Sequence, residues 1–141
     1  MGDVCAKVMR EIDQPIEKIW AVVSNFGDVS WAMPGVRVDV EGSGVGMKRV
    51  MHMPNSDPVT ETLDTLDPVN YSFSYVIPKM PMPISDFRGW AKLEKLSDNK
   101  TRVNWGADAQ TQEGGDAAQF SAMFEGMYGQ LLASLDAQVS K

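Results

Sequence analysis

Hydrophobic residues near the end of the chain recur at intervals of three and four positions. This spacing keeps side chains on one side of a helix with about 3.6 residues per turn. It therefore predicts one long helix from Asp116, its N-cap, to about residue 139. At about 1.5 Å per residue the helix is about 35 Å long, enough to cross one face of a sheet. The predicted buried face consists of Phe120, Met123, Phe124, Met127, Leu131 and Leu135.

The preceding part of the chain is a series of short apolar and alternating runs separated by turn-forming residues, a pattern typical of β-strands. Short turns between consecutive runs favour antiparallel pairing, in which one face of the sheet is buried and the other is wet. Seven strands are predicted, at residues 6–12, 36–41, 47–53, 59–66, 71–77, 85–96 and 101–109.

Two short helices are predicted between the first and the second strand. Pro15 suits a first helical turn because its missing N–H costs nothing there, and Asp13 or Gln14 can cap that helix. A second helix is expected over residues 29–33, ended by Pro34-Gly35. The elements together predict an α+β fold, with a curved antiparallel sheet wrapped around the C-terminal helix. Such a fold tends to enclose a cavity.

Length and charge narrow the functional classes. We expect residues 1–141 to form a single domain. The net charge is −6 and no basic stripe is present, which argues against binding to nucleic acid. No apolar run approaches the ~20 residues that span a membrane, so membrane insertion is not expected. The first residues lack the basic and apolar regions of a secretory signal. We therefore expect a cytoplasmic protein, monomeric or weakly homodimeric.

No metal site or cofactor is expected. The chain has one histidine, His52, and one cysteine, Cys5, which excludes an internal disulfide and a zinc site built from several such ligands. The glycine-rich segment 42–46 lies between two predicted strands, so we interpret it as a hairpin turn rather than a phosphate-binding loop. His52 is expected to face solvent, because it alternates with Met51 and Met53 along its strand.

Several short motifs, taken in order and spacing, resemble the START-like or SRPBCC superfamily and, within it, the polyketide cyclase/dehydrase-type proteins. The resemblance covers almost the whole chain. It implies the helix-grip fold and a hydrophobic cavity between sheet and C-terminal helix, but no shared chemistry, since members transfer lipids, sense hormones or cyclise polyketides. The motifs are residues 12–20 (IDQPIEKIW), 31–36 (WAMPGV), 44–49 (GVGMKR), 61–67 (ETLDTLD), 81–87 (PMPISDF) and 101–105 (TRVNW).

Strand alternation and the predicted helix face assign the residues of this cavity. Glu61 is the best polar candidate, because the resemblance places the matching glutamate inside the pocket, and Arg49 can pair with it. Alternatively, Glu61 lies in water at the pocket mouth without a role. The predicted ligand-binding residues are Arg49, Met51, Met53, Glu61, Leu63, Phe73, Tyr75, Ile84, Phe87, Trp105, Met123, Phe124, Met127 and Leu131.

Three further features concern the shape of the cavity. Gly89 is expected to leave room opposite the final helix, with Trp90 facing the outer surface. The methionines clustered around the predicted cavity suit either an adaptable binding surface or ordinary packing. The proline-containing loops 54–58 and 79–83 are expected to form stiff lips of the pocket.

Three functions are compatible with this pattern. The first is binding of a small apolar or aromatic ligand, such as a lipid or a polyketide-like metabolite. The second is an enzyme of the cyclase or aromatase kind, in which Glu61 is the only plausible catalytic residue, with Tyr75 or Arg49 as weaker candidates. The third is a co-chaperone-like interaction module with a filled core. Pocket volume separates the third from the others, and turnover separates the second from the first.

Overall fold

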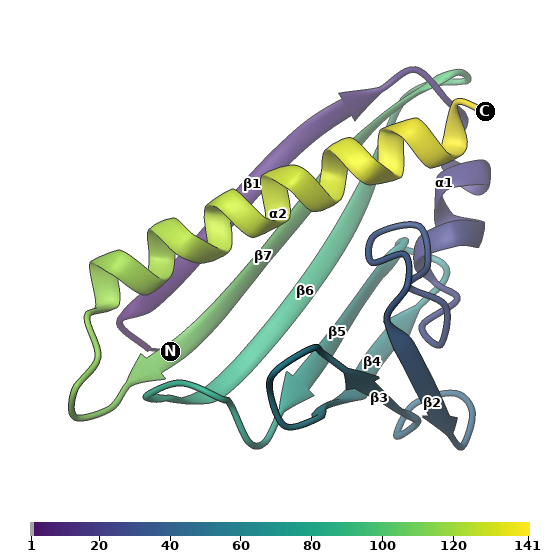
Figure 1. Cartoon of the computed structure of the whole chain (residues 1–141). Coiled ribbons are helices and arrows are strands. Elements are labelled where there is room, and N and C mark those ends of the chain that lie inside the picture. The colour runs from purple at the N-terminus through teal and green to yellow at the C-terminus, as the bar shows by residue number, and fades with distance from the viewer. Residues whose placement is uncertain (1) are drawn as a thin grey trace.

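The computed structural model describes residues 2–141, which form one seven-stranded sheet and two helices (Figure 1). The strands are paired antiparallel in the order β1-β7-β6-β5-β4-β3-β2, so that β1 and β2 form the two edges. This confirms the α+β, helix-grip architecture. The elements are β1 (Val4–Ile12), α1 (Ile16–Val23), β2 (Arg37–Glu41), β3 (Lys48–His52), β4 (Val59–Asp67), β5 (Ser72–Ile77), β6 (Ile84–Ser97), β7 (Lys100–Thr111) and α2 (Ala117–Val139).

Helix α2 runs along β1 and β7, across one side of the curved sheet (Figure 1). Two polar contacts join it to the edge strand. The backbone N–H of Cys5 donates to the Ser121 hydroxyl at 3.0 Å, and Arg10 Nε donates to Asp136 at 2.9 Å. An edge strand presents unpaired backbone groups, so the Ser121 contact also satisfies a donor that the sheet leaves free.

The buried face of α2 is rotated relative to the prediction. The N-cap is as predicted, since Asp116 accepts a hydrogen bond from the backbone N–H of Gln119 at 3.2 Å. Met123 and Met127, however, are 36% and 54% exposed and border the buried stripe rather than forming it. The helix packs sideways over β1 and β7, which leaves its methionine side uncovered. Its buried residues are Phe124, Tyr128, Leu132, Leu135 and Val139.

Two short helices were predicted between β1 and β2, and the prediction of the second one is wrong. Residues 29–33 form a single turn, in which Met33 N–H donates to the Val29 carbonyl at 2.8 Å, and no helix follows. Proline at the next position cannot donate a helical hydrogen bond, and Gly35 adopts φ 86°, outside the helical region. The connection to β2 is therefore a compact loop.

Helix α1 begins at Ile16, one residue after Pro15, which was predicted to lie in its first turn. Pro15 is the N-cap, and its carbonyl accepts from the N–H groups of Lys18 and Ile19, whereas no side chain caps the helix. The helix buries Ile16, Ile19 and Val23 against the core, as their spacing predicts.

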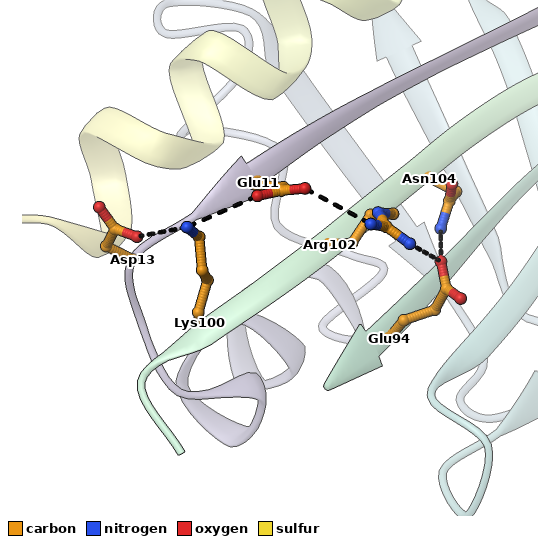
Figure 2. Close-up of polar contacts among 6 residues, drawn as sticks. All are labelled: Glu11, Asp13, Glu94, Lys100, Arg102 and Asn104. Carbon is orange, nitrogen blue, oxygen red and sulfur yellow. Dashed lines mark hydrogen bonds and ion pairs between the residues drawn. The ribbon is translucent and has the colours of Figure 1, made fainter. Parts of the chain in front are cut away.

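The outer face of the β1-β7-β6 region carries a chain of charges (Figure 2). Glu11 and Glu94 flank Arg102 in the register of the sheet, with N–O distances of 3.4 and 3.8 Å. Lys100 and Asn104 extend the chain at its two ends. Opposite charges on neighbouring strands support pairing, although each exposed pair contributes less than about 1 kcal/mol.

Within residues 2–141, no helix combines the length and apolar character needed to cross a membrane.

The position of Phe124 predicts a large loss of stability on truncation. Its ring packs against Phe87, with centroids 5.3 Å apart, and only 3% of the residue is exposed. Phe124→Ala should lower the free energy of unfolding by about 3–5 kcal/mol, measured by urea denaturation. The control Glu125→Ala, at the adjacent exposed position, should change it by about 0.5 kcal/mol or less. Equal stability of the two variants would contradict this placement of the helix.

Candidate functional site

A pocket of about 520 Å³ opens between α2, the inner face of β3 to β7 and three loops, which join α1 to β2, β3 to β4 and β5 to β6. Its walls are mainly apolar and aromatic. Seven of the ten methionines of the chain line it, namely Met33, Met51, Met53, Met80, Met82, Met123 and Met127. Thioether side chains are flexible and polarisable, so such a wall can adapt to ligands of different shape.

All but two of the predicted ligand-binding residues line this pocket. The exceptions are Leu63 and Ile84, which are 2% and 5% exposed and belong to the packed core. Ile84 is separated from Phe87 by an irregularity of β6 between Ser85 and Arg88, which breaks simple alternation. The lining residues are Arg49, Met51, Met53, Glu61, Phe73, Tyr75, Phe87, Trp105, Met123, Phe124, Met127 and Leu131.

The residues predicted from the sequence do not include several that line the pocket. Tyr128 follows Phe124 by four positions and precedes Leu132 by four, so a helix face centred on these three residues would have identified it. Val29, Trp31 and other residues of the α1–β2 loop also line the pocket. No periodic signal marks a loop residue as pocket-facing, because its direction depends on how the loop folds over the sheet.

Arg49 and Glu61 form a buried ion pair at the pocket wall. They are directly opposite each other in the β3–β4 register, and each residue is only 8% exposed. Arg49 Nε and Nη2 approach the same carboxylate oxygen, Glu61 Oε1, at 2.7 and 2.5 Å. Arg49 Nη1 donates to the carbonyl of Phe26 at 2.9 Å. The predicted pairing is confirmed, and it also ties the loop after α1 to the sheet.

Two aromatic rings lie close to the arginine of this ion pair. The Arg49 guanidinium lies over the Phe26 ring, 3.8 Å from its centroid, and 5.3 Å from the centroid of Tyr75. Such stacking stabilises a desolvated cation, because the ring face carries negative potential. Phe73 packs edge-on against Trp105, with centroids 5.5 Å apart, and extends the aromatic wall across the sheet.

Gly89 has a different role from the one predicted. A Cβ atom at this position would lie 2.3 Å from Cζ of Tyr75, the residue opposite it on β5. The space is therefore filled by the Tyr75 ring, which lies flat across β6 and reaches the indole of Trp105, with Nε1 and the hydroxyl 3.5 Å apart. Trp90 faces the outer side, as predicted, where its ring covers Gly106.

Two tyrosine hydroxyls remain neutral in this environment. Burial, followed by the negative charge of Glu61, raises the pKa of Tyr75 above its usual value. Burial and the adjacent Tyr75 raise the pKa of Tyr128 well above its usual value. Both side chains line the pocket, so they offer it neutral hydroxyl groups at physiological pH.

The remaining candidates for chemistry lie elsewhere. His52 is on the opposite face of β3 from Met51, and its Nε2 is 2.8 Å from Asp39 Oδ2. This contact with His52 is the main cause of the lowered pKa of Asp39. Cys5 is an exposed thiol on β1. Within residues 2–141, no group of three or more His, Cys, Asp or Glu residues could hold a metal ion.

The contact between Gly89 and Tyr75 predicts opposite effects of alanine at two glycines. Gly89→Ala should lower the free energy of unfolding by about 1–3 kcal/mol, since the added methyl group overlaps the ring. Gly129→Ala on α2, where nothing lies within 4 Å of an added Cβ, should raise it by about 0.5–1 kcal/mol. Urea denaturation measures both. A Gly89→Ala protein as stable as the natural one would contradict the packing described.

The buried tyrosines predict a loss of stability at alkaline pH. Their pKa values are raised in the folded protein, whereas phenols of the unfolded chain titrate near pH ~10. Above that pH the unfolded chain releases protons that the folded protein keeps, so the free energy of unfolding falls as pH rises. Tyr128→Phe should show a shallower fall in urea titrations between about pH 8.5 and about pH 11. Parallel curves for the two proteins would count against a buried, neutral Tyr128.

Comparison with known proteins gives the same fold. The protein XoxI from Bacillus cereus is 18% identical, with 98% of this chain and 96% of that one covered and a TM-score of 0.85. A protein from Nitrosospira multiformis is 23% identical, with coverage of 96% and 95% and a TM-score of 0.80. Norcoclaurine synthase from Thalictrum flavum, in complex with dopamine and hydroxybenzaldehyde, is 12% identical, with coverage of 96% and 85% and a TM-score of 0.75. At these identities the likeness shows the fold alone.

Sequence comparison identifies the family. No curated protein matches the chain in sequence. The sequence profile of the family described as polyketide cyclase/dehydrase and lipid transport matches residues 3–140. Because this match covers nearly the whole chain, the protein belongs to the polyketide cyclase/dehydrase and lipid transport family.

Proposed function

We propose that this protein binds a small hydrophobic molecule, aromatic or lipid-like, in the pocket between α2 and the sheet. The observation that carries the proposal is the volume of about 520 Å³ behind apolar and aromatic walls. Ligand pockets of proteins are typically of this size and are lined mostly by such side chains, with a few polar groups. The family description, which includes lipid transport, supports the same class of ligand.

The pocket volume favours binding over the interaction module with a filled core. A packed interior has few voids larger than a water molecule. Here, by contrast, Met123 and Met127 stay partly exposed beside a pocket that they line. Removing such side chains from water by covering them with an apolar ligand is favourable, by about 25 cal/mol for each Å² of apolar surface.

The cyclase-type alternative rests on Glu61. This carboxylate faces the pocket, but one of its oxygens is occupied by Arg49. Norcoclaurine synthase shows that an enzyme can be built on this fold with two small aromatic molecules bound. We nevertheless prefer binding without turnover, because the other carboxylate of the described lining, Asp28, is engaged by hydrogen bonds from Ser30. The cytoplasmic location expected from the sequence stays part of the proposal.

A neutral fluorescent probe tests the binding. N-phenyl-1-naphthylamine emits strongly only in apolar surroundings, so its fluorescence should rise and saturate on titration with the protein. Leu131→Trp places a larger side chain at a half-buried position of the pocket wall, and it should weaken binding at least tenfold, about 1.4 kcal/mol. Ala118→Trp, an exposed position on the same helix that does not line the pocket, serves as the matched control.

The control separates pocket binding from general stickiness. Ala118→Trp should bind the probe like the natural protein. Equal binding by Leu131→Trp and Ala118→Trp would place the probe outside the pocket, and no fluorescence change with the natural protein would overturn the proposed function. Circular dichroism of all three proteins checks that the fold is retained.

A further inference from the structure

We propose that the pocket selects neutral ligands that carry a hydrogen-bond donor, such as a hydroxyl group, and that this donor binds Oε2 of Glu61. Ionised carboxylates and phosphates of the same apolar shape are rejected. The inference rests on the proposed function, because it names the class of ligand that the same pocket takes. It follows from the asymmetric geometry of the Arg49–Glu61 pair.

The first step concerns the free oxygen of Glu61. Both guanidinium nitrogens that face the carboxylate, Nε and Nη2 of Arg49, contact Oε1. The hydrogen bond that Glu61 accepts among the described residues ends on Oε1, and none ends on Oε2. Glu61 lines the pocket and its side chain keeps 10% of its surface exposed, so Oε2 is open to a ligand there. A carboxylate oxygen so placed gains from any donor that enters.

The second step concerns Arg49, which could otherwise attract anions. An arginine binds carboxylate or phosphate through a fork of two neighbouring N–H groups. The fork formed by Nε and Nη2 is engaged by Glu61, and Nη1 donates to the carbonyl of Phe26. The guanidinium also lies over the Phe26 ring, 3.8 Å from its centroid. The donors of Arg49 are therefore used by contacts within the protein and are not available to an anionic ligand.

The third step concerns the charge of the pocket as a whole. Among the described lining residues, Arg49 is the only basic side chain, whereas Glu61 and Asp28 are both acidic. Hydrogen bonds from Ser30 lower the pKa of Asp28, so this carboxylate stays charged at neutral pH. The lining thus carries a net negative charge. An anion entering it would lose its hydration and meet repulsion without a cation to compensate.

The fourth step concerns the neutral polar groups beside the pair. The hydroxyls of Tyr75 and Tyr128 resist ionisation because burial raises the pKa of both side chains. They line the same space as Glu61 and can exchange hydrogen bonds with a ligand hydroxyl. A ligand with one neutral donor and an apolar body therefore satisfies the polar part of the wall and fills the apolar remainder.

Three probes of one shape test this selectivity at pH ~7. Pyrene has no polar group, 1-hydroxypyrene carries a neutral donor and 1-pyrenecarboxylate is ionised. Trp31 and Trp105 line the pocket, so binding is followed by the loss of tryptophan emission through energy transfer to the pyrene ring. We expect 1-hydroxypyrene to bind about 10–100-fold more tightly than pyrene, as a hydrogen bond to a charged group implies. We expect 1-pyrenecarboxylate to bind at least about tenfold more weakly than pyrene.

Replacement of the carboxylate should reverse this order. Glu61→Gln keeps the shape of the side chain but leaves the charge of Arg49 uncompensated, so the carboxylate probe should gain affinity and the hydroxyl probe should lose its advantage. Glu125→Gln makes the same charge change at an exposed position of α2 outside the pocket, and it should preserve the natural order. If Glu61→Gln fails to fold, the double variant Arg49→Met with Glu61→Leu removes both charges, and it should bind pyrene and 1-hydroxypyrene equally.

The outcomes separate the two proposals. Binding of pyrene without any preference for 1-hydroxypyrene would overturn the selectivity while leaving the proposed function intact. Tighter binding of 1-pyrenecarboxylate to the natural protein would also overturn it, since Arg49 would then be free to receive an anion. If none of the three probes binds, both proposals fail.

Discussion

The inner face of the sheet is wider than one helix can cover, and the rest of the structure depends on this mismatch. Helix α2 packs along β1 and β7 (Figure 1). It buries Phe124, Tyr128 and Leu132 against the core. The inner residues of β3 to β5 remain, and apart from Arg49 and Glu61 they are mainly apolar. Loops after α1, β3 and β5 cover them in part, and the uncovered space is the pocket. The pocket is thus a consequence of where the helix lies.

A buried ion pair in such a wall is unusual in energetic terms. Desolvation of two charges can exceed their attraction, and replacement by apolar residues is often neutral or stabilising. Arg49 and Glu61 are supported by further contacts, because Arg49 also binds the Phe26 carbonyl and stacks on its ring. The pair therefore couples the loop that covers the pocket to the strands beneath it. The free carboxylate oxygen of Glu61 is the polar feature that distinguishes this pocket from a purely apolar one.

Small residues on β6 make the aromatic wall possible. Because Gly89 has no side chain, the Tyr75 ring lies across β6 and meets Trp105 on β7. The ring thereby forms part of the pocket wall. The methionines around it give the opposite property, since their side chains can adjust. A pocket with fixed polar and aromatic residues on one side and adaptable methionines around them suits a protein that recognises one feature of a ligand and tolerates variation in the rest.

Periodicity in the sequence predicted the seven strands, the long C-terminal helix and the inward direction of Arg49 and Tyr75, whereas the family resemblance placed Glu61 inside the pocket. These features are local, because alternation along a strand and spacing along a helix follow from backbone geometry alone. Residues 29–33 show a limit of that reasoning, since an apolar run without a continuing hydrogen-bond ladder gave one turn and not a helix.

Tertiary structure alone decided the side of α2 that is buried, the partner of Gly89 and the loop residues that line the pocket. Met127 and Tyr128 are neighbours in sequence, and only the sideways packing of the helix on β1 and β7 buries the tyrosine and exposes the methionine. The sequence likewise predicted that Arg49 can meet Glu61. It could not determine that both nitrogens bind one oxygen and leave the other open, because that choice depends on the Phe26 carbonyl and ring, which reach Arg49 from a distant part of the chain.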